Sequence, residues 1–148
     1  MNLTKLVILA LIESPEQTFL VSVRHDPIVP EAHMKYDLIG GTNEFGEHPE
    51  DTVRREVFEE VGIHLLDLQL LPIVTQKKWQ RTDSEMHTVV LCYHGKVNST
   101  DCLVQDGKIN SLRWITRDEL QTLDFLPTVE PFIAYFLRED GDLKVTAQ

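Results

Sequence analysis

Three glutamates lie close together in one short segment of the chain. The stretch RREVFEEVG, residues 54–62, contains Glu56, Glu59 and Glu60. Residues three and four positions apart are neighbours on a helix surface, so these like charges cost about 0.2–0.5 kcal/mol per pair. A hard divalent cation would offset this cost, since Mg²⁺ binds through carboxylate oxygens. The spacing therefore indicates a metal site, with a solvated acidic face as the simpler alternative.

The segment that carries the glutamates is predicted to be a helix over residues 49–61. Pro49 is typical of a first helical turn, and Gly62 is typical of a helix stop. Apolar residues that recur every four positions predict a buried stripe: Val53, Val57 and Val61. The glutamates then point away from part of this stripe, toward a cleft or toward solvent.

Short strands are expected around this helix. The nearly continuous apolar run over residues 3–12 is typical of a strand that is covered on both faces. Residues 18–24 are predicted to be its hairpin partner. Further strands are expected over residues 35–39, ending at two glycines, and over residues 65–79, 85–97 and 111–115.

Two helices are expected near the end of the sequence. Thr116 begins a capping box that opens a helix through about Leu123, and Thr128 is predicted to cap a second helix. Core residues recur at helical spacing on this second helix: Phe132, Ile133, Phe136 and Leu137. Together the elements predict an α/β (α+β) fold in which a mixed sheet lies between helices, with a single domain over residues 1–148.

The composition narrows the choice of partners. The chain has 148 residues, a formal charge of −10 and a pI near 4.9. Nucleic-acid polymers and anionic membranes require a basic surface, so we expect neither as a partner. The N-terminal apolar run is too short to span a membrane and has no signal-peptide cleavage site. Cys92 and Cys102 lack zinc-ligand spacing and are predicted to be reduced thiols in a cytoplasmic protein.

The fixed residues around the glutamates resemble the Nudix box, G-x(5)-E-x(7)-R-E-U-x-E-E-x-G-U, where U is aliphatic. Gly41 is followed by five residues and Glu47, and then by seven residues and the stretch REVFEEVGI, residues 55–63. Every specified position is satisfied, and chance would give this match about once in 10⁸ to 10⁹ starting points. The resemblance implies a Nudix-like α/β/α sandwich and a hydrolase that cleaves a nucleoside diphosphate linked to a further group.

The resemblance also implies roles for individual residues. Arg55 and Glu47 correspond to a pair that fixes the loop against the helix through a bidentate contact. Gly41 and Gly62 are expected to allow a turn and a left-handed helix stop. The implied metal is Mg²⁺, with Mn²⁺ as a substitute. Its implied ligands are Glu56, Glu59, Glu60 and the carbonyl of Gly40.

The general base and the substrate contacts have several candidates. Asp106 lies in a loop of the expected kind, although an Asp-Gly pair also forms ordinary turns. Glu85 and one of the box glutamates are the alternative bases. For the substrate contacts, surface charge and ordinary packing are the alternative interpretations. The candidates are Arg24 and Lys35 for phosphate, and Tyr36 and Trp79 for stacking on a base.

These features predict a Mg²⁺-dependent hydrolase of a small nucleotide, with a (deoxy)nucleoside triphosphate cleaved to monophosphate and pyrophosphate as the favoured reaction. Alternative substrates are ADP-ribose, a nucleotide sugar or a dinucleoside polyphosphate. A non-catalytic nucleotide-sensing domain is the alternative of another class. Val129 stands where the MutT-like branch has a base-contacting Asn, which argues against specificity for 8-oxo-dGTP. Exposed strand edges are compatible with a homodimer.

Overall fold

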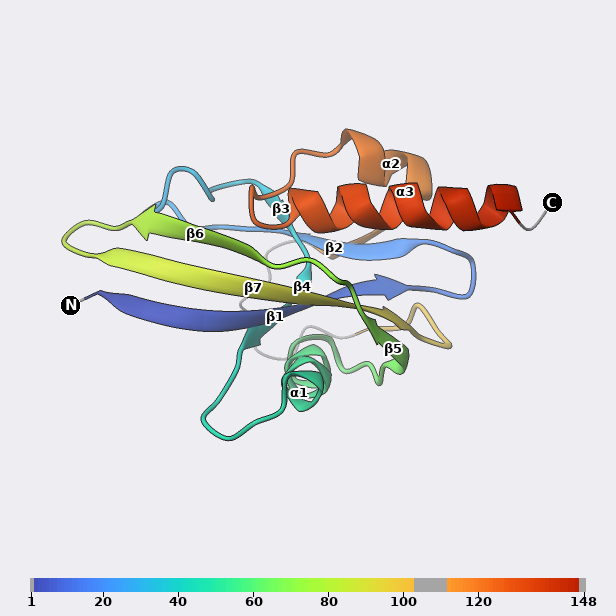
Figure 1. The fold of residues 1–148 in the computed structure, drawn as a ribbon, viewed down its shortest axis with the longest axis horizontal. Coiled ribbons are helices and arrows are strands. Elements are labelled where there is room, and N and C mark those ends of the chain that lie inside the picture. Colours follow the sequence, from blue (N-terminus) through green and yellow to red (C-terminus); the bar gives the residue numbers. More distant parts are fainter. Residues whose placement is uncertain (1, 103–111, 147–148) are drawn as a thin grey trace.

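The fold is a mixed β-sheet with one helix on one face and two helices on the other (Figure 1). The computed structural model describes residues 2–102 and 112–146. In this part of the chain the sheet has eight strands. The elements are β1 (Leu3–Glu13), β2 (Phe19–Val23), β3 (Tyr36–Asp37), β4 (Ile39–Thr42), α1 (Pro49–Val61), β5 (Leu66–Leu70), β6 (Thr75–Gln80), β7 (Glu85–Lys96), β8 (Leu112–Ile115), α2 (Arg117–Thr122) and α3 (Glu130–Thr146).

Strands β1 and β7 form the centre of the sheet and run parallel, in register from the pair Leu3 and Met86 to the pair Glu13 and Lys96. The other strand pairings are antiparallel. Alternate side chains of β1 enter two different cores, one beneath α1 and one beneath α2 and α3. This burial on both faces explains the continuous apolar sequence of β1, and it confirms the predicted sandwich.

Helix α1 has the bounds that the sequence predicts. Its N-cap is His48, whose Nδ1 accepts a hydrogen bond from the Glu50 backbone N–H at 3.0 Å. Histidine is not among the common capping residues, and so the sequence did not indicate this cap. Gly62 ends the helix with a left-handed φ of 73°. The predicted stripe is fully buried: Val53, Val57 and Val61.

Helices α2 and α3 cover the opposite face of the sheet. The capping box of α2 is present, because Thr116 Oγ1 accepts from the Glu119 N–H and Glu119 Oε1 accepts from the Thr116 N–H. Helix α3 begins at Glu130, so Thr128, the predicted cap, lies one residue before the cap position. The predicted core residues of α3 are buried or partly buried: Phe132, Ile133, Phe136 and Leu137.

The strand predicted over residues 35–39 is wrong in two respects. It is divided at Leu38, because β3 pairs with β2 whereas β4 pairs with β1. It also continues through Gly40 and Gly41 instead of ending before them. A side chain at Gly40 would collide with the backbone carbonyl of Ile8, so this glycine serves the close approach of two strands.

The strand predicted over residues 65–79 is also divided. Strands β5 and β6 both pair with β7, and Pro72 lies in the break between them. Proline has no N–H to donate to a strand ladder, which is the physical reason for an interruption at this point.

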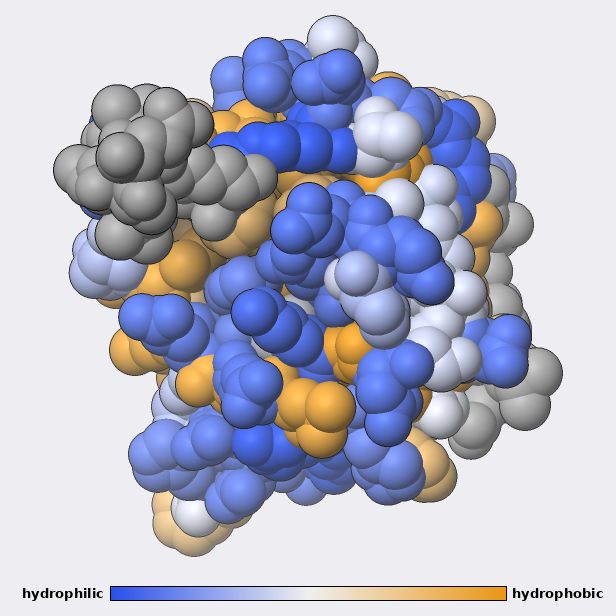
Figure 2. Space-filling model, turned by 90° about the vertical axis from the view of Figure 1, so that its right-hand side faces the viewer, coloured by the Kyte–Doolittle hydropathy of each residue, from blue (hydrophilic) through white to orange (hydrophobic). Residues whose placement is uncertain are grey.

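Hydrophilic side chains predominate on the face drawn in Figure 2, with hydrophobic side chains in small groups among them. None of the helices in the described part of the chain is long and apolar enough to cross a bilayer. Cys92 and Cys102 are both free thiols, and burial raises the pKa of Cys92 to about 12.

Candidate functional site

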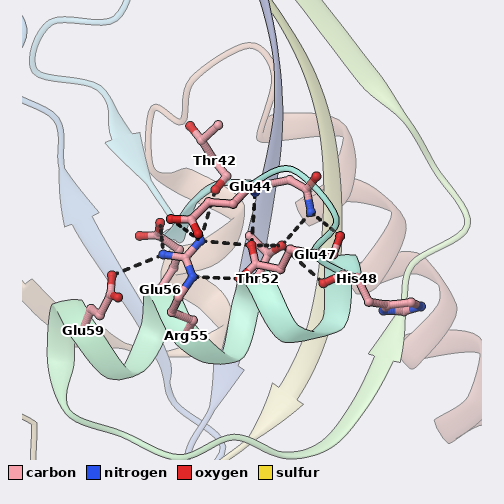
Figure 3. Close-up of polar contacts among 9 residues, drawn as sticks. Thr42, Glu44, Glu47, His48, Thr52, Arg55, Glu56 and Glu59 are labelled. Carbon is pink, nitrogen blue, oxygen red and sulfur yellow. Dashed lines mark hydrogen bonds and ion pairs between the residues drawn. The ribbon is translucent and has the colours of Figure 1, made fainter.

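Arg55 lies at the centre of a group of carboxylates where the loop after β4 meets α1 (Figure 3). Its Nε donates to Glu47 Oε2 at 2.8 Å, and its Nη2 donates to Glu47 Oε1 at 3.0 Å. This is the bidentate contact that the sequence predicts, in which a planar guanidinium holds a carboxylate in one orientation. It ties the loop to the helix.

Glu47 accepts two further hydrogen bonds. Thr52 Oγ1 donates to Glu47 Oε1 at 2.7 Å, and the Glu44 N–H donates to the same oxygen at 3.1 Å. The bond from Arg55, followed by the bond from Thr52, lowers the pKa of Glu47 to about 2. The hydrogen bond to Glu47 in turn raises the pKa of Arg55 above its usual range. Both groups therefore stay charged at neutral pH.

Arg55 also contacts the carboxylates of the box. Its Nη1 donates to Glu56 Oε1 at 2.9 Å and to Glu59 Oε2 at 3.3 Å. Glu44 Oε1 lies 3.7 Å from Nη2 of the same arginine. The guanidinium thus shares its single positive charge among four carboxylates, and the group keeps a net charge of −3. We call these five residues the carboxylate cluster: Glu44, Glu47, Arg55, Glu56 and Glu59.

Glu56 explains the glycine at position 41. A Cβ atom at Gly41 would collide with the Glu56 carboxylate. The expected turn at Gly41 is wrong, because Gly41 lies within β4. Among the described residues the glycines with positive φ are Gly46 and Gly62. Gly41 therefore leaves the space in which the Glu56 carboxylate lies against the strand.

The carboxylate cluster and Glu60 together form the acidic region of the site, and Glu60 is the member that lines a pocket. Its position is four residues after Glu56 on α1, and it is 9% exposed. Glu60 lines a pocket of about 280 Å³ together with Arg24, Asp37 and Gly40, and we call this the box-side pocket. Asp37 is half-buried there, and desolvation raises the pKa of its carboxyl group, although Nη1 of Arg24 lies 3.4 Å from its Oδ2 and opposes this shift.

A second pocket, of about 210 Å³, opens on the face of the sheet that carries α3. Alternate residues of β1 and β7 line it, together with Trp79 of β6, residues 40–42 of β4, and residues from the loop after β2 and from the segment before α3; we call it the central pocket. The residues that line both pockets are Arg24, Asp26, Asp37, Leu38 and Gly40. The central pocket therefore adjoins the box-side pocket, and through it Glu60.

The donor chemistry of the acidic region fits a hard divalent cation. Glu56, Glu59 and Glu60 offer only carboxylate oxygens, and the region carries excess negative charge. Within residues 2–102 and 112–146, no group of three or more His, Cys, Asp or Glu side chains forms a ready chelating arrangement. The contacts from Arg55 orient Glu56 and Glu59 instead.

Two of the predicted substrate contacts line the central pocket. Arg24 lies where the two pockets meet and is held by ion pairs to Asp26 at 3.6 Å and Asp37 at 3.4 Å. Trp79 is 8% exposed, and its Nε1 donates to Thr88 Oγ1 at 3.0 Å. The indole ring is therefore held in place in the pocket wall.

The other two predicted contacts lie outside both pockets. Lys35 Nζ is 2.6 Å from Asp124 Oδ2, and the Tyr36 ring packs against Phe125 with centroids 6.1 Å apart. This placement favours surface charge for Lys35 and packing for Tyr36.

The candidate bases are placed unequally. Asp106 lies outside the described residues. Glu85 starts β7, where its N–H donates to Asn2 Oδ1 at 3.1 Å, and it lines neither pocket. Among the candidate bases placed by the structure, Glu60 of the box lines a pocket.

Sequence reasoning missed four charged residues that line the pockets: Lys5, Asp26, Asp37 and Arg81. Two of them carried a signal. Lys5 is a charged residue in an otherwise apolar strand. Arg81 follows Trp79 by two positions, and residues two apart in extended chain point to the same face, so Arg81 is expected on the same face as Trp79. Asp37 carried none, because its burial depends on neighbours that are distant in sequence.

Solved structures of several proteins share this fold. The MutT protein from Methanosarcina mazei Go1 is 23% identical, with a TM-score of 0.66 over 93% of this chain and 95% of that chain. The NUDIX domain of Shewanella oneidensis NrtR, solved with ADP ribose, is 15% identical, with a TM-score of 0.71 over 94% of this chain and 90% of that chain. The MutT NUDIX hydrolase from Burkholderia pseudomallei is 26% identical, with a TM-score of 0.63 over 78% and 85%.

Curated relatives match in sequence. An NAD-capped RNA hydrolase NudC from Pseudomonas aeruginosa is 30% identical over 88 residues, which are 60% of this chain and 29% of the relative. The protein of the same name from Pseudomonas syringae pv. tomato is 28% identical over 108 residues, which are 72% of this chain and 36% of the relative. The chain thus spans about a third of the length of these relatives.

The family comparison covers nearly the whole chain. The model of the NUDIX domain matches residues 3–139, a range that contains the complete box, both pockets and most of α3. The predicted resemblance is confirmed, and the chain belongs to the NUDIX domain family.

Proposed function

We propose that this NUDIX domain hydrolyses a phosphoric anhydride bond of a small nucleotide with the help of Mg²⁺. The favoured substrate is a (deoxy)nucleoside triphosphate, and the products are the monophosphate and pyrophosphate. The observation that carries this proposal is that the two pockets meet at Arg24 and Gly40, with Glu60 in one pocket and apolar strand residues in the other. The anhydride would lie at the acidic end, and the nucleoside would enter the central pocket.

Glu56, Glu59 and Glu60 would hold Mg²⁺, together with the carbonyl of Gly40, and Mn²⁺ would substitute. A bound ion of this kind neutralises phosphate oxygens and favours ionisation of water. Arg55 has a positioning role, because its hydrogen bonds fix the directions of the Glu56 and Glu59 carboxylates.

Arg24 is the cation best placed for the substrate phosphates. Its guanidinium lies where the two pockets meet, and two carboxylates hold it there. In the proposed reaction the oxygen of water bonds to phosphorus, and the anhydride P–O bond breaks. The leaving phosphate oxygen keeps the electron pair, and one of the box carboxylates accepts the proton of the water.

A second candidate substrate is a nucleoside diphosphate linked to a sugar or to a second nucleoside, as in ADP-ribose, nucleotide sugars and dinucleoside polyphosphates. The names of the relatives favour it, because the matched NudC proteins are hydrolases of NAD-capped RNA and the matched NrtR domain was solved with ADP ribose. A nucleotide-sensing domain without turnover is the alternative of another class. A cytoplasmic location, a single domain and a homodimer stay predictions.

The test is a product screen by mass spectrometry. The purified protein is incubated with Mg²⁺ and a pool of dNTPs, NTPs, ADP-ribose, nucleotide sugars and dinucleoside polyphosphates, with EDTA as the metal-free control. Release of a monophosphate and pyrophosphate from one triphosphate supports the proposal. Cleavage of ADP-ribose or a dinucleotide alone favours the second candidate, and no turnover with Mg²⁺ or Mn²⁺ favours the sensing domain.

A further inference from the structure

The central pocket has a cationic end that lies away from the box-side pocket. Lys5 and Arg81 line this end. On β1, Lys5 lies four residues before Leu9, which pairs with Gly40. Arg81 follows the last pair of the β6–β7 ladder, Gln80 and Glu85, and this turn lies at the same end of the sheet as the start of β1 (Figure 1). Two positive charges therefore lie at the end of the central pocket that is away from Gly40 and the box-side pocket.

The cations of the pocket differ in their partners. Arg24 forms ion pairs with Asp26 and Asp37. Among the described residues, no carboxylate forms an ion pair with Lys5 or Arg81, and Arg81 Nε is buried with no hydrogen-bond partner. A buried donor that lacks an acceptor costs free energy, so its retention in a pocket calls for a ligand that supplies the acceptor.

The pocket beside Arg81 is suited to a planar ring. Trp79 precedes Arg81 by two residues, and its bond to Thr88 holds the indole in the wall. Met86 pairs with Trp79 across the ladder, and Val7 lies on the neighbouring strand β1. Arg81 therefore lines the same pocket as one aromatic and several apolar side chains, which would pack against a planar ring.

We propose that Arg81 reads the nucleobase of the substrate and selects a 6-oxopurine, with Lys5 as an additional donor. The proposal rests on the proposed function and narrows its substrate to guanine-type nucleotides. An arginine presents two parallel N–H donors, and these match the adjacent O6 and N7 acceptors of guanine or hypoxanthine. Adenine has an amino group in place of O6, so a donor would face a donor.

Binding of monophosphates tests this assignment without any turnover. Isothermal calorimetry compares GMP, IMP and AMP on the wild-type protein, and we expect GMP and IMP to bind about 10- to 100-fold more tightly than AMP. IMP lacks the 2-amino group of GMP, so similar affinities for these two ligands place the recognition at O6 and N7.

Variants of Arg81 complete the test. Arg81→Ala and Arg81→Lys are both expected to reduce the preference for GMP over AMP to about twofold, since lysine keeps the charge but has no fork of donors. Lys78→Ala is the matched control, because Lys78 is an exposed cation of β6 that lies outside the pockets. It should keep the wild-type preference. Thermal unfolding verifies that each variant is folded.

Three outcomes would overturn the proposal. They are equal binding of GMP and AMP to the wild type, an unchanged preference in Arg81→Lys, and an equal loss of all three ligands in Arg81→Ala, which would indicate a phosphate contact. The proposed function fails separately. A protein that prefers GMP and IMP but hydrolyses no nucleotide would keep the base assignment and lose the hydrolase.

Discussion

Arg55 lies in the carboxylate cluster and Arg81 lines the central pocket, and the two arginines differ in how their N–H donors are used. Arg55 donates to Glu47, Glu56 and Glu59, and its pKa is raised by these contacts. Arg81 has a buried Nε without an acceptor among the described residues. The first arginine is occupied by its own protein, whereas the second is available to a ligand.

This difference separates positioning from recognition. An arginine whose donors are filled by carboxylates fixes the geometry of those carboxylates, so its loss should affect all substrates alike. An arginine in a pocket whose N–H donors lack acceptors contributes to the difference in affinity between one ligand and another. The two ends of the site should therefore respond to mutation in different ways, and four measurements examine the box end.

The largest effect is expected from Glu60→Gln. Glutamine keeps the size of the side chain but removes the charge from a residue that is 9% exposed and lines the box-side pocket. Loss of one metal ligand should lower Mg²⁺-dependent turnover about 10³-fold, since metal-ion catalysis supplies several kcal/mol. The measurement is kcat at saturating Mg²⁺ for at least two nucleotides.

Glu16→Gln is the matched control for this charge change, because Glu16 is exposed in the turn between β1 and β2. It should leave kcat unchanged. Full turnover in Glu60→Gln would remove this residue from the metal site, and a loss confined to one nucleotide would break the contrast between positioning and recognition.

Gly41→Ala should have the next largest effect. The added methyl group collides with the Glu56 carboxylate and must displace it. A displacement of about 1 Å in a catalytic group can cost about 10²-fold in rate, and we expect the Mg²⁺ concentration for half-maximal activity to rise.

The control for this variant is Gly95→Ala in β7, where the added methyl group meets Leu68 and Leu65 side chains instead. It should lower the unfolding temperature without changing the Mg²⁺ dependence. An unchanged Mg²⁺ dependence in Gly41→Ala would show that the position of Glu56 does not matter to the metal.

Arg55→Lys should have a smaller effect. A lysine cannot reproduce the bidentate contact with Glu47 while also reaching Glu56 and Glu59. Loss of a residue that orients metal ligands typically costs about 10- to 100-fold, and we expect the lower end because a positive charge remains. The same factor should apply to every nucleotide, as measured by kcat/KM.

Arg138→Lys provides the comparison, because Arg138 is 65% exposed and pairs with Glu139 on the surface of α3. Exposed pairs contribute little, so its activity and stability should stay at wild-type values. A substrate-dependent loss in Arg55→Lys would assign Arg55 to recognition instead.

The sequence predicted the box end of the site far better than the pocket end. The spacing of Glu47, Arg55 and the helix glutamates is local, and a helix converts such spacing directly into proximity. The bidentate pair of Glu47 and Arg55 was therefore predicted correctly. Gly41 was wrongly assigned to a turn. The real reason for this glycine is the Glu56 carboxylate beside it, and a contact between a strand and a helix cannot be inferred from local sequence.

The pocket end depends on pairings that no local pattern reveals. Lys5 and Arg81 are 76 positions apart in the chain, and they line one pocket because β1 and β7 pair in parallel while β6 pairs with β7. Lys35 was chosen for its charge ahead of the two glycines and Tyr36 for its aromatic ring, yet Lys35 pairs with Asp124 and Tyr36 packs against Phe125. The strand register is set by the whole sheet, and it determines which of the candidate residues line the central pocket.

The smallest effect concerns the acid stability of the box end. The pKa of Glu47 is lowered from its ordinary value of 4.5 to about 2, chiefly by the hydrogen bond from Arg55. Because the folded state favours the ionised form, this stabilisation is complete above pH 4.5 and is lost as the pH falls toward about 2. Urea midpoints measured from about pH 7 to about pH 2 should thus fall more steeply for the wild type than for Glu47→Gln, which cannot be protonated in this range. The two curves should converge near the acid end, whereas Glu16→Gln should follow the wild type throughout. Parallel curves for the wild type and Glu47→Gln would show that the charge of Glu47 adds nothing to its contact with Arg55, and the positioning role of Arg55 would then rest on its bonds to Glu56 and Glu59.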